Sequence, residues 1–270
     1  MTDFTINAPT RQSIFLLQRA NDVRAETTRR LATGLRIGRV NDGPSAFFQA
    51  RGLNDRARDL LQAKDGIGQA VSAVESSLAG LDSIENLLGQ LKGVALAARD
   101  GSAEQRQAAA EQFNSLRSQI DALAADAGFQ GTNLISAGAD DLDVSLNETG
   151  SSSLTVSGRA SDAASLGINA ATNSFATDAD IAASVAEIDS AIASLRSGAS
   201  ALGSSVATLQ VRENFIDTLS NTLESGAGKL INADLNEEGA RLLSSQVRSD
   251  LGTEGLRLAA RSDASIADLL

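Results

Sequence analysis

Four carboxylates gather in one short polar stretch, and carboxylates are the residue type from which a calcium loop or an acid–base pair is built. They are Asp140, Asp141, Asp143 and Glu148. An EF-hand-type loop needs a glycine at its sharp turn, and this stretch has Leu146 in that place. We therefore interpret the four carboxylates as solvated residues of strand ends and a turn, and expect no metal site.

Other site chemistry is restricted by two missing residue types, since the chain contains no histidine and no cysteine. Their absence excludes Ser–His and Cys–His nucleophiles and the usual zinc ligand sets. A site made of carboxylates alone stays open in principle. The composition therefore predicts a protein that is not an enzyme and that binds no cofactor.

The formal net charge is −11, which disfavours a nucleic-acid partner, because phosphate neutralisation requires clustered Lys and Arg. The one basic tract, residues 24–39, is interpreted as a solvated or partner-facing helix surface, with a polyanion site as the alternative. No apolar run approaches the ~20 residues needed to span a bilayer, so no membrane partner is expected. The N-terminal stretch also shows no cleavable secretory signal.

Two long stretches repeat apolar residues in alternating steps of three and four, the spacing of a narrow seam that packs against another helix. Residues 45–99 and 178–226 would form helices of roughly 80 and 75 Å, and their similar lengths favour antiparallel pairing. The predicted seam residues are Ile67, Val71, Val74, Leu78, Leu81, Ile188, Ile192, Leu195, Leu202 and Leu209.

Shorter elements surround these helices. A first helix is expected from about Thr10 to Leu35, and a shorter one, capped by Ser102, as far as about Asp126. Alternating apolar residues predict a β-hairpin at about 140–158. Glycines at 226 and 228 mark a weak point before a last helix at about 237–270. The expected fold is mainly α: a long antiparallel coiled-coil helical rod with a small β-hairpin and paired N- and C-terminal helices.

The first helix carries an apolar band wider than one neighbouring helix requires, and the last helix ends in apolar residues. An apolar chain end can be buried in a neighbouring molecule or docked on the chain's own first helix, and both interpretations stay open. The residues expected to drive self-assembly are Ile14, Phe15, Leu17, Leu31, Leu35, Leu243, Val247, Leu251, Leu258, Ile266, Leu269 and Leu270.

With these residues in view, the chain resembles a bacterial flagellin of the short form, without outer surface domains. The tracts that carry the resemblance occur in the family's order along nearly the whole chain. They are Arg30-Leu31-Ala32-Thr33-Gly34-Leu35-Arg36-Ile37, Asn41-Asp42-Gly43, Phe129-Gln130-Gly131-Thr132-Asn133-Leu134-Ile135, Ser165-Leu166-Gly167-Ile168, Ile231-Asn232-Ala233-Asp234 and Asp268-Leu269-Leu270.

The resemblance implies a secreted, extracellular structural protein that self-assembles into the bacterial flagellar filament for swimming motility. Residues 1–43 with 230–270 would form a terminal coiled coil in the filament core, and residues 44–229 a rod domain in the outer tube. The implied partners are further copies in a homopolymer, the flagellar export apparatus, the hook-junction and cap proteins, and an export chaperone. The nearest alternative is a hook–filament junction protein, and a coiled-coil signalling rod is a more distant one.

Overall fold

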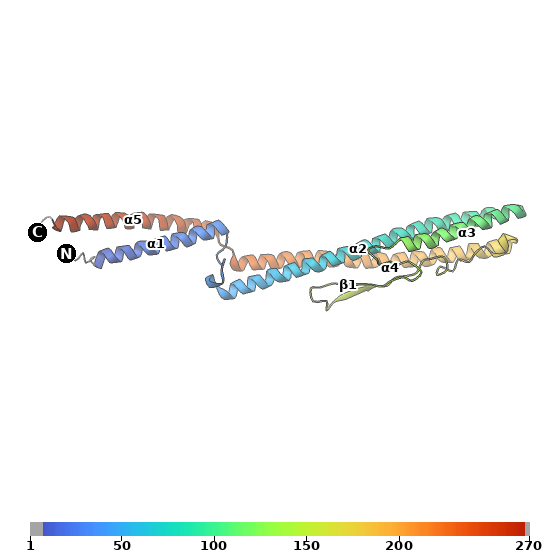
Figure 1. The fold of residues 1–270 in the computed structure, drawn as a ribbon, viewed down its shortest axis with the longest axis horizontal. Coiled ribbons are helices and arrows are strands. Elements are labelled where there is room, and N and C mark those ends of the chain that lie inside the picture. The colour runs from blue at the N-terminus through green and yellow to red at the C-terminus, as the bar shows by residue number, and fades with distance from the viewer. Residues whose placement is uncertain (1–7, 268–270) are drawn as a thin grey trace. The chain divides into compact units, whose positions relative to one another are not determined.

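The computed structural model describes residues 8–267, and contacts divide the chain into two compact units. Unit 1 comprises residues 1–55 and 222–270, and unit 2 comprises residues 56–221. The elements are α1 (Ala8–Thr33), η1 (Val40–Asp42), α2 (Pro44–Ala98), α3 (Ala103–Asp126), β1 (Leu142–Ser145), β2 (Ser153–Val156), η2 (Thr172–Phe175), α4 (Asp178–Ile231) and α5 (Leu235–Ala267) (Figure 1). The predicted mainly α class, with long helices, a hairpin and paired terminal helices, is confirmed.

Unit 1 is built on the pairing of α1 with α5, which lie side by side (Figure 1). The buried and half-buried residues of α5 recur in steps of three and four, the period of a helix packed on one neighbour. The series comprises Glu238, Leu242, Ser245, Ser249, Gly252, Leu256 and Ala259, and Gly239 is half-buried beside it. The Ser245 hydroxyl donates to the Ala20 carbonyl at 2.8 Å, which places this face of α5 against α1.

A short ladder of backbone hydrogen bonds lies where α1 ends and α5 begins. Gly34 ends α1 in the left-handed region (φ +70°), the conformation that glycine adopts at helix ends. The amides of Arg36 and Ile37 then donate to the Ile231 carbonyl, and the Ala233 amide donates to the Gly34 carbonyl. This ladder joins the end of α1 to the segment that leads into α5, although the two are far apart in the chain.

Unit 2 is built on α2 and α4, which run antiparallel and are tied by three ion pairs. These pairs are Lys64–Asp217, Glu85–Arg196 and Lys92–Asp189. The three residues lie 21 and then 7 residues apart along α2, and their partners lie 21 and 7 apart in the opposite direction along α4. Both spacings are whole heptads, so one register holds along the pair, as the matched seams predict.

The hydrophobic core of unit 2 includes buried residues of α3 together with those of the long helices. Ser102 caps α3 in a capping box, exchanging hydrogen bonds with Gln105. Phe113 of α3 meets Phe175 edge to face, with ring centroids 5.3 Å apart, and both rings are fully buried. This contact places the end of η2 against α3.

The predicted hairpin is also present. β1 and β2 pair antiparallel with Leu142 opposite Val156, and the remaining pairs follow in order. Two arginines hold the hairpin on the long helices: Arg56 of α2 pairs with Glu148 at 2.8 Å, and Arg212 of α4 donates to the Leu146 carbonyl at 2.8 Å. The hairpin is therefore fixed at its turn as well as along its strands.

Two predicted helix boundaries are wrong. α4 does not weaken at Gly226–Gly228 but continues to Ile231. A glycine inside a helix costs about 1 kcal/mol, and burial of Ala227 together with the packing of Leu53 near Gly226 offsets this cost. The last helix begins at Leu235 because Asp234 caps it, accepting from the Asn236 amide at 2.9 Å. No helix within residues 8–267 is long and apolar enough to cross a membrane.

Candidate self-assembly surfaces

The interface between α1 and α5 is made largely of small and polar residues. Thr27, Ser245 and Ser249 are buried there, and Gly252 approaches Leu17 so closely that a Cβ atom at residue 252 would lie 2.9 Å from Leu17 Cδ1. Such an interface lets the helices approach closely but buries few of their large apolar side chains. Those side chains must therefore lie elsewhere on the helix surfaces.

On α5 the large apolar side chains form an exposed stripe, which we call the α5 stripe. It consists of Leu243, Val247, Leu251 and Leu258, of which Leu243 is 70% exposed. At 3.6 residues per turn the stripe lies about 175° around the helix from the face that meets α1. Four of the predicted self-assembly residues are thus turned away from the chain's own first helix.

The predicted residues of α1 divide into two groups. Ile14 and Phe15 are exposed, whereas Leu17 and Leu31 are half-buried. Leu35 follows the helix and forms a backbone bridge with Asn232. Three predicted residues of the C-terminal helix cannot be placed: the Ile266 side chain, Leu269 and Leu270 lie outside the described part of the chain.

A groove of about 820 Å³ runs along one side of the α1–α5 pair. We call it the α1–α5 groove. Its main lining residues are Leu16, Val23, Leu251, Arg19, Arg241 and Arg248. The self-assembly residues predicted from the sequence do not include Leu16 and Val23. These two residues are one heptad apart, and this spacing is a sequence signal that they share a helix face.

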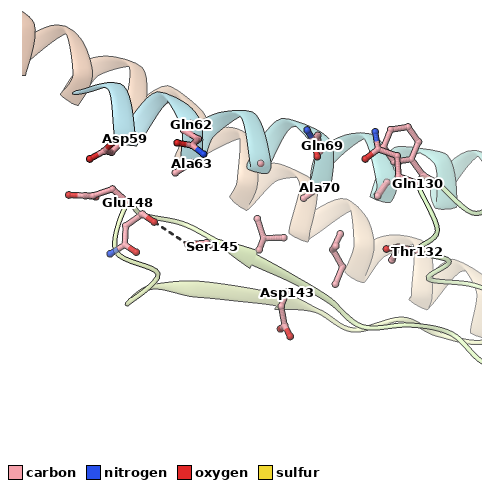
Figure 2. Close-up of a pocket in the computed structure, with 16 residues that line it drawn as sticks. Asp59, Gln62, Ala63, Gln69, Ala70, Gln130, Thr132, Asp143, Ser145 and Glu148 are labelled. Carbon is pink, nitrogen blue, oxygen red and sulfur yellow. Dashed lines mark hydrogen bonds between the residues drawn. The ribbon is translucent and has the colours of Figure 1, made fainter. Parts of the chain in front are cut away.

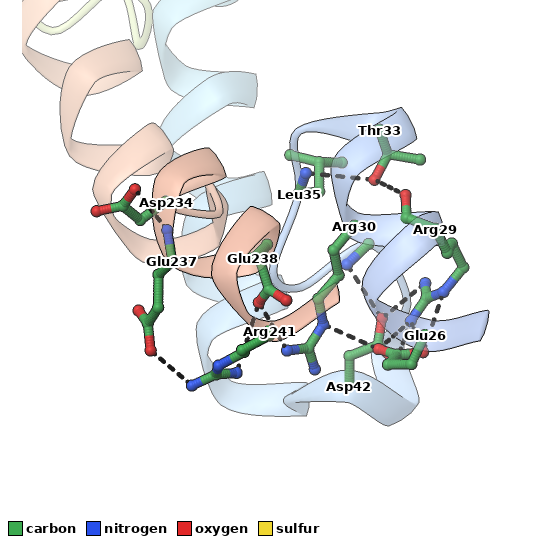
Figure 3. Close-up of polar contacts among 11 residues, drawn as sticks. Glu26, Arg29, Arg30, Thr33, Leu35, Asp42, Asp234, Glu237, Glu238 and Arg241 are labelled. Carbon is green, nitrogen blue, oxygen red and sulfur yellow. Dashed lines mark hydrogen bonds and ion pairs between the residues drawn. The ribbon is translucent and has the colours of Figure 1, made fainter. Parts of the chain in front are cut away.

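A cluster of alternating charges connects the C-terminal part of α1 with η1 and with the first turn of α5 (Figure 3). Arg30 Nη1 lies 3.1 Å from Glu238 Oε1, and the same guanidinium binds Glu26 at 3.0 Å. Arg29 binds Glu26 at 2.6 Å and Asp42 at 3.3 Å. The hydrogen bonds from Arg29 hold the pKa values of Glu26 and Asp42 below their ordinary range.

This cluster accounts for much of the basic tract at residues 24–39. Beyond Arg29 and Arg30, Arg24 donates to Gln246 and Arg36 donates to the Leu230 carbonyl near the end of α4. A cation is favourable beside the last carbonyls of a helix. The tract therefore contacts other segments of its own chain through four of its arginines.

The predicted seam residues of unit 2 lie inside it. Most are buried, and Val71, Leu78 and Ile192 are half-buried. These side chains are covered by their own chain, in contrast to the α5 stripe. The structure thus separates the predicted residues into a covered set in unit 2 and a largely exposed set in unit 1.

Two carboxylates of the hairpin region, Asp143 and Glu148, line a polar groove of about 570 Å³ between α2 and β1 (Figure 2). Asp140 accepts from the Asn133 amide, Asp141 from the Gly158 amide and Asp143 from the Thr155 hydroxyl. Each side chain thus fixes a different part of the loop or hairpin. Among the described residues, no cluster of three or more His, Cys, Asp or Glu could hold a metal ion.

Charge is distributed unequally between the units. Unit 1 contains 13 Lys and Arg against 13 Asp and Glu, whereas unit 2 contains 10 against 21. The whole net charge of −11 is therefore carried by unit 2. A neutral unit with exposed apolar stripes can be packed closely among copies of itself, and a strongly acidic one repels its copies and stays hydrated.

Terminal helices that pair with each other and expose apolar faces define a structural protein of the helical, self-assembling class. Residues 6–140 match the bacterial flagellin N-terminal helical region, and residues 185–270 match the C-terminal helical region. The chain belongs to the bacterial flagellin family. It is a structural subunit of the extracellular flagellar filament, which is a homopolymer, and the family is not one of enzymes.

Individual relatives agree along the whole chain. Flagellin FljM of Caulobacter vibrioides is 32% identical over 262 residues, which cover 95% of each chain. A flagellin of Brucella melitensis is 26% identical over 279 residues, covering 100% of this chain and 99% of that one.

Two solved structures share the fold. The crystal structure of Bacillus cereus flagellin has a TM-score of 0.50 and 20% identity, covering 56% of this chain and 88% of its own. A putative flagellar hook-associated protein from Vibrio parahaemolyticus has a TM-score of 0.60 and 16% identity, covering 71% of this chain and 100% of its own.

Proposed function

We propose that the α1–α5 pair forms the core of the filament and that the helices of the central region form its outer tube. In sequence terms the core comprises residues 1–43 and 230–270, and the outer tube comprises residues 44–229. The observation that carries this proposal is the α5 stripe, which is exposed on the side of α5 opposite to α1. The neutral charge of unit 1 supports the same assignment, because close packing of copies then meets little net repulsion.

In this proposal the self-assembly residues are the exposed apolar side chains of both terminal helices, and neighbouring copies cover them. The gain is the hydrophobic one, about 25 cal/mol for each Å² of apolar surface removed from water. The α5 stripe offers such surface from Leu243 to Leu258, over about four turns of the helix. Repetition of one head-to-tail contact gives a filament, because the contact does not close on itself.

Truncation tests the assignment. A chain that lacks residues 256–270 loses Leu258 from the stripe but retains every residue of unit 2. We expect it to form no filaments in negative-stain electron microscopy, whether seeded with filament fragments or salted out. Circular dichroism should still report the α2–α4 helices. Filaments of normal length from the truncated chain would contradict the proposal.

We infer the partners outside the homopolymer from membership of the flagellin family. We infer that the chain passes through the flagellar export apparatus, meets hook-junction and cap proteins at the filament ends, and is held by an export chaperone before assembly. The alternative role, a hook–filament junction protein, predicts a chain that does not polymerise alone. Persistent monomers of the full chain under seeded and salted conditions would favour that role over a filament subunit.

A further inference from the structure

The residues that line the α1–α5 groove restrict the kind of surface that can bind in it. Its walls combine apolar Leu16, Val23 and Leu251 with three arginines, and none of its lining residues is acidic. Arg241 is engaged by Glu237 at 2.7 Å, and Arg19 lies over the Phe15 ring at 4.7 Å. Arg248 is exposed and forms no ion pair with any residue of the described part. A ligand for this groove must be apolar and anionic together.

The α5 stripe has the complementary chemistry. Asp250 follows Leu243 by seven residues and Glu254 follows Val247 by seven, so both acids share the face of the stripe. Asp250 is exposed and forms no ion pair among the described residues, while Glu254 meets Arg257 at 3.4 Å. Arg257 follows Asp250 by seven residues and lies on the same face, where its charge offsets that of Glu254. Between Leu243 and Leu258 the stripe thus presents apolar side chains with Asp250 as its carboxylate outside an ion pair.

The two surfaces also match in length and can be used at the same time. The groove follows α5 from Arg241 to Gly252, about 17 Å, and the stripe extends about 22 Å from Leu243 to Leu258. Leu251 lies at the border between them, and their other members are different residues. A stripe that docks in another copy's groove leaves the α1–α5 pairing of its own copy intact, because the stripe faces away from α1. Each copy offers one groove and one stripe, so the contact is head-to-tail and can be repeated without closing.

We propose that the α1–α5 groove of one copy receives the α5 stripe of a second copy, with Arg248 meeting Asp250 across the contact. This inference rests on the proposed function and specifies which two surfaces of the core meet. Apolar contact supplies the affinity, and the opposite charges select the groove–stripe pairing over groove–groove and stripe–stripe pairing.

Charge reversal with mixing tests the pairing. In Arg248→Glu a glutamate of the groove faces Asp250 of the stripe, and in Asp250→Arg an arginine of the stripe faces Arg248 of the groove. Each variant alone should polymerise about tenfold more slowly than the unsubstituted chain or not at all, because opposite charges have become like charges. An equal mixture should recover polymerisation, since each groove then finds a complementary stripe on the other variant. Light scattering gives the rate, and differently tagged variants seen in one filament show co-assembly.

Controls separate this contact from the proposed function. Arg51→Glu reverses an exposed arginine of unit 1 outside the groove and should polymerise normally. Both single variants should keep the circular dichroism of the parent, because the substituted side chains are exposed on α5. Failure of the mixture to recover, or normal polymerisation of either variant alone, would overturn the groove–stripe pairing. Failure of the unsubstituted chain to polymerise would contradict the filament function itself.

Discussion

Arg30 and Glu238 meet across the α1–α5 interface with 3.1 Å between Nη1 and Oε1, although 208 residues separate them in the chain. The Glu238 side chain is only 5% exposed, and its second carboxylate oxygen has no hydrogen-bond partner in the described part. Burial of a charge is costly unless it is paired, so this contact favours one register of α1 against α5. The uncharged residues that make up most of the rest of the interface, half-buried leucines among them, specify the register less strongly.

Substitution of Glu238 should therefore loosen the terminal helices. Glu238→Gln leaves Arg30 without its interhelical counter-charge, and we expect unit 1 to lose about 1–3 kcal/mol of stability. Hydrogen exchange of the amides near Ser245 measures this loss directly. Arg257→Gln removes an exposed pair with Glu254 and should change exchange by less than about 0.5 kcal/mol. Equal effects of the two substitutions would show that the buried pair has no special role.

Acid should weaken the same region. The pKa values of Glu26 and Asp42 are lowered by hydrogen bonds from Arg29, so the folded form releases these protons more readily than the unfolded chain. The resulting stability is fully present above the ordinary carboxylate pKa, about 4, and is lost as the pH falls through the lowered folded values. Hydrogen exchange of α1 amides between pH 6 and pH 3 should report this loss. Asp42→Asn should reduce the pH dependence, and an unchanged profile would count against the assignment.

Gly80 lies where α2 approaches the end of α3 and the loop that follows. A Cβ atom at residue 80 would lie 2.8 Å from both Ala127 Cβ and Ile135 Cδ1, so Gly80→Ala should destabilise unit 2 by about 1–3 kcal/mol. Gly89 is the matched control, because no atom lies within 4 Å of a Cβ there, and Gly89→Ala should stabilise α2 by about 0.5–1 kcal/mol. Thermal unfolding followed by circular dichroism gives the sign of the stability change in each variant. Opposite signs support the close contact at residue 80, whereas stabilisation of both variants would show only the effect of added helix propensity and contradict the prediction.

Three consecutive residues other than glycine adopt the left-handed region before α4: Asn173, Ser174 and Phe175. Ser174 (φ 53°) is exposed, so Ser174→Gly should relieve strain and raise the unfolding free energy by about 0.5–1 kcal/mol. The neighbouring Ala176 has φ −57°, so Ala176→Gly should lower stability by a similar amount. Chemical denaturation of both variants provides the measurement. A loss of stability in Ser174→Gly would show that the turn is unstrained.

Much of the architecture could be predicted from sequence because it depends on periodicity. The heptad positions of Ile67 and Ile188 determine which face of each long helix is apolar, and similar lengths favour antiparallel pairing. Alternation around Val144 predicts a strand, and Ser102 with Gln105 forms a local cap. These features need only residues near one another in the chain, so they are readable without any knowledge of tertiary contacts.

The sequence by itself thus determined the helices, the hairpin, the family and the set of apolar residues on the terminal helices. Only the tertiary structure decided which of those residues are covered. Leu17 faces α5 and Leu243 faces away because close approach at Gly252 and the Arg30–Glu238 pair select one face of each helix. Continuation of α4 through Gly226 was likewise decided by packing, here of Leu53. Periodicity marks the faces that can be buried, but contacts between segments distant in sequence select the face that is buried.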